Sequence, residues 1–221
     1  LITNVAIQKT TFKYEIPYML LITAVLLVMG MTGNEITFIE GVILWILFIA
    51  YLLYLYFLAK KGNDSGDEQS VKLYPVWKCL LFIVLGGLCV VIGSQLVVNG
   101  ATTIARACGM SERFIGLTIV AFGTSLPELV TSVSAARKGN AGIAIGNIVG
   151  SNIFNILFVI GTVALICPVP FESRFVIDTV VAILCGVLLW GGTIRHKELR
   201  KPCGVVMLLC YAAYFVYLAA M

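Results

Sequence analysis

Long apolar stretches restrict this 221-residue chain to a membrane-spanning fold more firmly than any other feature. A helix needs about 20 apolar residues to cross the hydrocarbon core of a bilayer. Backbone N–H and C=O groups must be paired within lipid, so each such stretch is expected to be helical. The sequence therefore predicts an all-α integral membrane protein with seven transmembrane helices, at about residues 16–31, 36–59, 79–101, 114–136, 141–166, 175–191 and 204–220.

Composition supports this class and excludes others. Charged residues make up only 12% of the chain, whereas a soluble domain carries about 25%. The net charge of +4 is small and no basic run with interleaved aromatics occurs, so we expect membrane lipid and not nucleic acid as a partner. The seven cysteines form no CxxC pair, which favours small core residues over a disulfide framework or a zinc site.

Basic residues predict the orientation. If successive loops alternate between the two sides of the membrane, twelve of the fifteen Lys and Arg residues share a side with the amino-terminal tail. Basic loops are retained in the cytoplasm, so we expect a cytoplasmic amino-terminal end and an external carboxyl terminus. The predicted organisation is a tail (1–15), two helices (16–59), a cytoplasmic loop (60–77) and five further helices (78–221).

An internal repeat relates two pairs of helices. Gly41–Tyr54 resembles Gly204–Tyr217 at an offset of 163 residues. An odd number of spans separates the copies, so they cross the membrane in opposite directions, as in secondary transporters. Chance agreement among Leu, Val and Tyr is the alternative. If the repeat is real, counterparts of residues 79–166 would precede the first span, and the chain is expected to be a fragment lacking about three helices.

One carboxylate lies deep in the fourth span. A charge at bilayer depth costs roughly 2.5–3.5 kcal/mol on insertion scales and marks a functional site by default. Helical spacing places Glu128 on one face with Ala121, Ser125 and Ser132, and puts Thr124 and Thr131 at the edge of that face. Pro127 lacks a backbone N–H, so we expect a helix break that exposes carbonyl groups.

The fifth span offers a matching polar face. Asn147, Ser151 and Asn155 recur every four residues beside a glycine ridge at Gly142, Gly146 and Gly150. Small residues allow helices to approach closely, so we expect the two spans to cross and to surround a shared point with oxygen ligands. Carboxylate, hydroxyl and carbonyl oxygens suit Na⁺ and Ca²⁺. The alternative is structural: hydroxyls such as that of Thr131 bond to their own backbone, and Asn residues join helices.

These two segments resemble a known family. Gly116–Glu128 and Gly146–Asn155 are similar to the alpha-repeat of the cation/calcium exchanger superfamily, of the prokaryotic sodium/calcium exchanger type. The resemblance implies a ten-helix fold of two inverted halves, 5+5, of which this chain matches spans 4–10. The second alpha-repeat is present at about residues 114–161, and the first is absent. A prokaryotic inner membrane is the implied location.

The resemblance also implies an ion pocket and an activity. The pocket maps onto the carbonyls of Ala121 and Thr124 and onto Ser125, Glu128, Ser151 and Asn155, with Asn147 and Thr131 as secondary candidates. The implied activity is antiport of Ca²⁺ for Na⁺ without a cofactor and without enzymatic chemistry, completed by missing amino-terminal helices that carry a second carboxylate. Several family members have Asp in place of Asn155, so proton- or potassium-coupled antiport is an alternative. A cation channel ranks lower, and an intramembrane hydrolase lacks a His or Lys in the spans.

Overall fold

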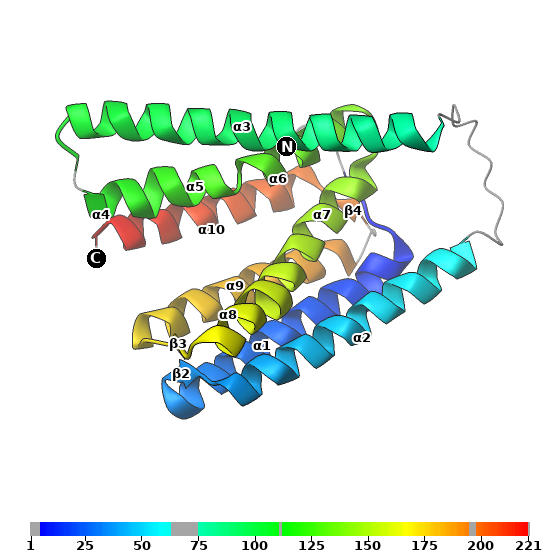
Figure 1. The fold of residues 1–221 in the computed structure, drawn as a ribbon, viewed down its shortest axis with the longest axis horizontal. Coiled ribbons are helices and arrows are strands. Elements are labelled where there is room, and N and C mark those ends of the chain that lie inside the picture. The colour runs from blue at the N-terminus through cyan, green and yellow to red at the C-terminus, as the bar shows by residue number, and fades with distance from the viewer. Residues whose placement is uncertain (1–4, 63–74, 111, 195–197, 221) are drawn as a thin grey trace.

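Helices make up nearly all of the computed structural model, which describes residues 5–62, 75–110, 112–194 and 198–220 (Figure 1). The helices of the first part are η1 (Thr11–Glu15, π-helical), α1 (Ile16–Gly33), α2 (Phe38–Gly62) and α3 (Val76–Ala107). They are followed by α4 (Glu112–Ile115), η2 (Gly116–Val120, π-helical), α5 (Ala121–Thr124), α6 (Leu126–Arg137), α7 (Ala141–Phe154), η3 (Asn155–Ile160, π-helical), α8 (Gly161–Ile166), α9 (Ser173–Ile194) and α10 (Lys201–Ala220).

The helices confirm the predicted membrane fold. Within the described residues, five helical segments are long and apolar enough to span a bilayer. A bent pair, Thr118–Thr124 with Leu126–Arg137, makes a sixth if it is counted as one span. The predicted seventh span corresponds to α10, whose apolar part is shorter. Most of the predicted cytoplasmic loop, residues 60–77, lies outside the described residues.

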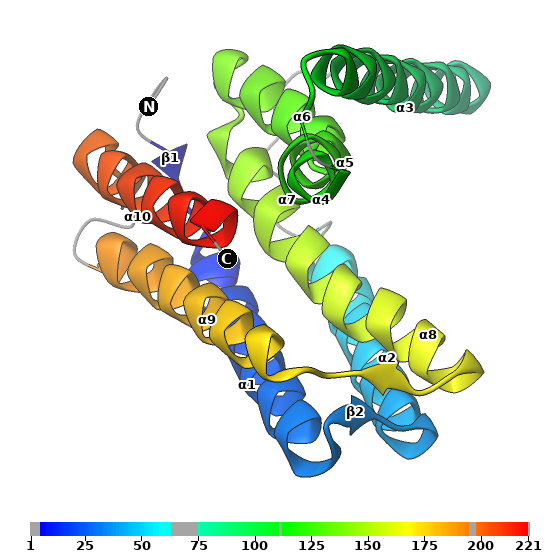
Figure 2. The same ribbon diagram turned by 90° about the vertical axis from the view of Figure 1, so that its left-hand side faces the viewer.

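The core lies where α1, α2, α9 and the α7–α8 segment meet. Ile22 of α1, Leu44 of α2 and Ile153 of α7 are fully buried there, because helices in this position turn apolar side chains toward one another on several faces. By contrast, within the described residues α3 packs mainly along the segment from α4 to α6, at one edge of the bundle (Figure 2). Most of its large apolar side chains are exposed. A helix that is apolar all round and exposed in this way is suited to contact with lipid or with another helix.

Two short antiparallel ribbons tie the loops together at opposite ends of α1 and α9. Strand β1 (Val5–Ala6) pairs with β4 (Glu198–Leu199), and β2 (Glu35–Ile36) pairs with β3 (Val169–Pro170). Adding 163 to the residue numbers of β2 gives β4, and adding it to the first residue of α2 gives the first residue of α10. The repeat offset read from helix sequence therefore also relates β2 to β4 and the start of α2 to the start of α10, which favours a true repeat over chance.

Candidate functional site

A break between α5 and α6 forms the centre of the candidate site, as the position of Pro127 predicts. The two helices are bent by 50° relative to each other. Ser125 stands between them with φ −92° and ψ 0°, outside the helical region, and Pro127 follows in the first turn of α6. Proline suits the first turn of a helix because its missing N–H has no intrahelical partner at that position.

The break redirects the hydrogen bonds of the backbone. The Ser125 N–H would bond to the Ala121 carbonyl in a continuous helix, but it donates to the Phe122 carbonyl at 3.1 Å. The Gly123 carbonyl has no helical donor, because residue 127 is a proline and lacks an N–H. This carbonyl accepts a hydrogen bond from Ser94 Oγ of α3 instead, at 2.9 Å. Sequence reasoning missed Ser94, since no spacing rule links residues of two spans. Its role is to satisfy a carbonyl that the proline leaves without a helical partner.

Glu128 lies in the first turn of α6 and is half-buried. Within the described part of the chain, its Oε2 atom is buried and has no hydrogen-bond partner. The positive end of the α6 dipole stabilises a carboxylate there, while the carboxyl end of α5 presents carbonyls that attract a cation. A buried, unpaired carboxylate oxygen is costly, so the arrangement fits a group that binds a cation.

Asn147 joins the two predicted segments. Its Nδ2 group lies within donating distance of the Glu128 carbonyl at 3.2 Å, and of Thr131 Oγ1 and Ser132 Oγ at 3.1 Å each. Thr131 in turn donates to the Pro127 and Glu128 carbonyls, which are both 3.0 Å from its Oγ1. The predicted crossing of the two spans is therefore confirmed. The contacts of Asn147 and Thr131 are those of helix packing.

The helix hairpin limits which residues of α7 can lie near Glu128. Helices α6 and α7 run antiparallel through a tight turn, so a step toward the end of α7 is a step toward the start of α6. Asn147 lies within hydrogen-bonding distance of Thr131. Counting helical turns from this contact, we expect Ser151 near the level of Glu128 and Asn155 near the level of the break. Ser151 Oγ donates to the Ile148 carbonyl at 3.1 Å, which leaves its lone pairs for a cation.

Asn155 marks a second irregularity. It is exposed and begins η3, a π-helical segment within the fifth span. Single π-helical turns inside α-helices occur frequently at functional sites, and this one was not predicted.

The glycine ridge differs from its prediction. A Cβ atom at Gly146 or Gly150 would meet no described atom within 4 Å, so no described backbone uses the close approach that these residues permit.

The predicted ligands of the site are neutral oxygens and one carboxylate. Among the described residues, no group of three or more His, Cys, Asp or Glu side chains is placed to hold a metal ion. The predicted ligands near Glu128 are hydroxyl, amide and carbonyl oxygens instead. Such ligands suit hard cations that are held weakly enough to leave again.

Comparison with known proteins identifies a family of similar proteins. A family model described as sodium/calcium exchanger protein matches residues 78–220. The putative antiporter CaxA of Alkalimonas amylolytica is 34% identical over 224 residues, which cover 97% of this chain and 70% of CaxA. Sodium/calcium exchanger MaX1 of Methanosarcina acetivorans is 38% identical over 142 residues, which cover 64% of this chain and 41% of MaX1. The solved structure of the sodium-calcium exchanger NCX_Mj soaked with 10 mM Na⁺ and 10 mM Sr²⁺ matches with a TM-score of 0.78 at 30% identity, covering 98% of this chain and 68% of NCX_Mj.

Proposed function

Because the chain belongs to the sodium/calcium exchanger protein family, we propose that it is part of a secondary antiporter that exchanges Ca²⁺ for Na⁺ across a membrane. The observation that carries the proposal is the buried, unpartnered Glu128 Oε2 at the α5–α6 break. Membership in a family of exchangers favours transport over enzymatic chemistry.

The ion site is proposed to lie between the break and the facing part of α7. Glu128 supplies the negative charge, and Ser125, Ser151 and Asn155 supply side-chain oxygens. The carbonyls of Ala121 and Thr124 replace part of the hydration shell. Since Na⁺ and Ca²⁺ both require the Glu128 carboxylate, they compete for it, and this competition couples their movement in opposite directions.

A divalent ion in a membrane needs more than one negative charge nearby. We propose that a second carboxylate comes from helices outside the present sequence, in support of which the chain covers 70% of the length of CaxA. The proposed location is the inner membrane of a prokaryote, with the β1–β4 ribbon at the cytoplasmic face, because the amino-terminal tail shares its side with most basic residues.

The test is substitution of the carboxylate by an amide. We expect Glu128→Gln in the full-length protein to abolish Na⁺-dependent ⁴⁵Ca²⁺ uptake into vesicles, because the amide keeps the size of the side chain and removes its charge. The matched control is Glu172→Gln, which changes an exposed carboxylate outside the site. Retained Na⁺-dependent uptake by Glu128→Gln would remove this residue from the proposed role.

The coupling ion is tested in the same vesicles. The neutral Asn155 lowers the charge of the pocket, so we keep proton- and potassium-coupled antiport as the second candidate. Uptake driven by an outward Na⁺ gradient, and not by an equal K⁺ gradient or a pH gradient, supports sodium coupling. Calcium flux that needs no counter-ion at all would point to a channel.

A further inference from the structure

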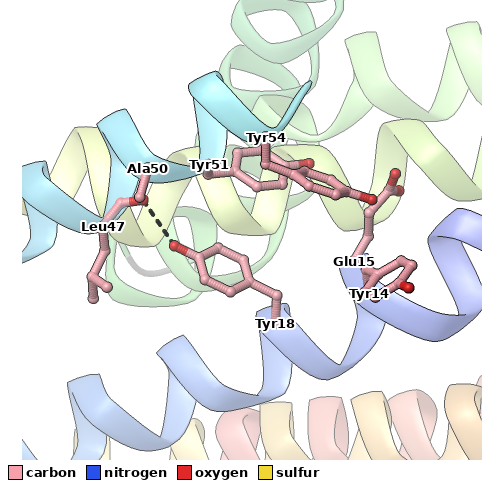
Figure 3. A pocket seen from close by; sticks show the side chains of 7 residues that line it. All are labelled: Tyr14, Glu15, Tyr18, Leu47, Ala50, Tyr51 and Tyr54. Carbon is pink, nitrogen blue, oxygen red and sulfur yellow. Dashed lines mark hydrogen bonds between the residues drawn. The ribbon is translucent and has the colours of Figure 1, made fainter. Parts of the chain in front are cut away.

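A cavity of about 290 Å³ lies between the start of the first span and the end of the second (Figure 3). Four tyrosine rings and one carboxylate make up most of its wall, which consists of Tyr14, Glu15, Tyr18, Leu47, Ala50, Tyr51 and Tyr54. Ligand sites range upward from about 300 Å³, so this volume suits a small chemical group. None of these residues belongs to the predicted ion pocket.

Contacts between α1 and α2 hold the cavity in shape. The Tyr18 hydroxyl donates a hydrogen bond to the Leu47 carbonyl at 2.8 Å. The Tyr18 ring also stacks on Tyr51, with 5.4 Å between the ring centroids and an interplanar angle of 8°. Tyr14 of the π-helical η1 contacts Tyr54 of α2 at a centroid distance of 6.1 Å. The two helices are thus joined around the cavity, which is formed before any ligand enters.

Polar groups at this cavity lack partners. The Tyr54 hydroxyl is buried and, among the described residues, has no hydrogen-bond partner. Neither ion pair of the described residues includes the half-buried Glu15 carboxylate. Glu15 is close enough to Tyr54 to interact with it electrostatically, and Figure 3 shows the Tyr54 hydroxyl directed toward the side on which Glu15 lies. Two oxygens that accept hydrogen bonds therefore share one small aromatic cavity.

The other copy of the repeat satisfies its carboxylate within the protein. Adding 163 to Glu15 gives Asp178, and adding it to Tyr51 gives Tyr214. The Tyr214 hydroxyl donates to Asp178 Oδ1 at 2.6 Å, a length typical of a bond to an ionised carboxylate. In the first copy Tyr51 stacks on Tyr18 instead. A cation from outside the chain can take the place at Glu15 that a tyrosine donor takes at Asp178.

The chemistry of the cavity favours an ammonium group. Aromatic rings attract cations, and a buried cation needs a carboxylate to offset its charge. A primary ammonium group has three donors, which can reach Glu15 and the Tyr54 hydroxyl, whereas a quaternary ammonium group has none. A hard metal ion would need six or more oxygen ligands, roughly, which is more than this wall supplies.

The depth of the cavity indicates a lipid as the source of the ammonium group. Glu15 lies near the start of a span that begins at Thr11, and Tyr54 lies near the end of a span that ends at Lys60. At about 1.5 Å per residue, both are within about 9 Å of these span ends. This depth is the border between the headgroups and the hydrocarbon.

A lysine beside the cavity matches the second charge of such a lipid. Lys13 is exposed, and its Nζ lies 5.3 Å from the centroid of the Tyr14 ring. Tyr14 itself is 50% exposed, so the cavity can be reached from outside the bundle. Lys13 and Glu15 together present a positive and a negative charge, which complement the phosphate and the ammonium of a zwitterionic headgroup.

We propose that this cavity binds the headgroup of a zwitterionic phospholipid with a primary ammonium group, such as phosphatidylethanolamine. Glu15 and Tyr54 accept hydrogen bonds from the ammonium group, the tyrosine rings surround it, and Lys13 pairs with the phosphate. Because the lipid binds the folded protein at the junction of η1 and α2, it stabilises that state. The site is separate from the ion pocket and does not depend on the proposed antiport.

The test measures lipid binding without an ion gradient. The full-length protein, delipidated in detergent, is titrated with phosphatidylethanolamine, phosphatidylcholine or phosphatidylglycerol, and native mass spectrometry gives an apparent dissociation constant for each. We expect phosphatidylethanolamine to bind about tenfold more tightly than the other two, because only its headgroup donates hydrogen bonds from a cation. Glu15→Gln should remove this preference, and Tyr54→Phe should reduce it about threefold while keeping the ring.

Controls separate the site from general lipid binding. Glu172→Gln and Tyr56→Phe change an exposed carboxylate and an exposed tyrosine outside the cavity, and they should leave the preference unchanged. Equal affinities for the three lipids, or an unchanged preference in folded Glu15→Gln, would overturn the proposal. If Glu15→Gln does not fold, Tyr54→Phe decides in the same way.

A further variant distinguishes the lipid from other sources of an ammonium group. Lys13→Gln should weaken binding of phosphatidylethanolamine by removing the partner of its phosphate, and free ethanolamine should compete poorly with the lipid. Ethanolamine that binds as tightly as the lipid would make a soluble amine the ligand and overturn the proposal. Tighter lipid binding by Lys13→Gln would do the same, because it would show that the Lys13 ammonium group itself occupies the cavity.

Discussion

Replacing Ser94 by alanine tests whether the break between α5 and α6 depends on a donor from α3. The Ser94 hydroxyl donates to the Gly123 carbonyl at 2.9 Å. The substitution leaves this carbonyl without that bond, and Pro127 has no N–H to replace it. We expect the end of α5 to shift and the carbonyls that face Glu128 to move with it.

The surroundings of Ser94 determine the free-energy cost of replacing it by alanine. Hydrogen bonds between helices in membranes are worth only about 0.6 kcal/mol on average, because the broken groups usually find other partners. An unsatisfied buried group costs about 1–3 kcal/mol. The second figure applies here, because the neighbouring cavity of about 330 Å³ between α3 and α6 is lined mostly by apolar side chains. A cost near 1.4 kcal/mol corresponds to a tenfold change in an equilibrium constant.

The assay is Na⁺-dependent ⁴⁵Ca²⁺ uptake as a function of Ca²⁺ concentration. We expect Ser94→Ala to raise the half-saturating concentration about tenfold. Thr103→Ala is the matched control, because the Thr103 hydroxyl bonds to a carbonyl of its own helix and is exposed.

A second substitution separates this cause from a general loss of packing. Pro127→Ala restores an N–H that can bond to the Gly123 carbonyl. In the Pro127→Ala background, Ser94→Ala should therefore cost much less than it does alone. Equal costs in the two backgrounds, within about 0.5 kcal/mol, would refute the reasoning.

Two further predictions concern the helices that hold the site. Asn147→Ala should lower the free energy of unfolding by about 1–3 kcal/mol, measured as a lower melting temperature in detergent, because it removes the donor between α6 and α7. Asn152→Ala, whose amide bonds within its own helix, should have little effect. Gly30→Ala should destabilise by about 1–3 kcal/mol, because its Cβ would overlap the Phe171 ring, whereas Gly33→Ala meets no described atom within 4 Å. Equal melting temperatures for either pair would contradict the corresponding contact.

Much of the fold follows from local rules. Hydrophobic length alone predicts the spans, and Pro127 predicts the break beside it. The repeat is also visible in sequence, because Gly41–Tyr54 and Gly204–Tyr217 keep similar residues in the same order. These features depend on residues that are close along the chain, so sequence patterns report them directly.

Features that depend on contacts between distant segments were not predictable in this way. Ser94 reaches Gly123 across 29 residues, and nothing in either segment indicates the pairing. The π-helical segment that begins at Asn155 packs against α2, and no local sequence pattern predicts it. The glycine ridge is the reverse case, a sequence pattern that suggests a contact the described structure lacks. Its spacing permits a close helix approach, but the tertiary structure decides whether another backbone uses it. The assignment of Ser125, Ser151 and Asn155 as ligands is still a prediction.

The β1–β4 ribbon has a consequence for how the chain is made. Val5 pairs with Leu199, which lies 194 residues later. At a synthesis rate of about 5–20 residues per second, roughly 10–40 s pass before the partner strand leaves the ribosome. During that time β1 has no partner strand, and α1 lies in the bilayer without α9 packed against it. Assembly of this core therefore waits for the synthesis of α9 and β4 and is not complete when α1 enters the bilayer.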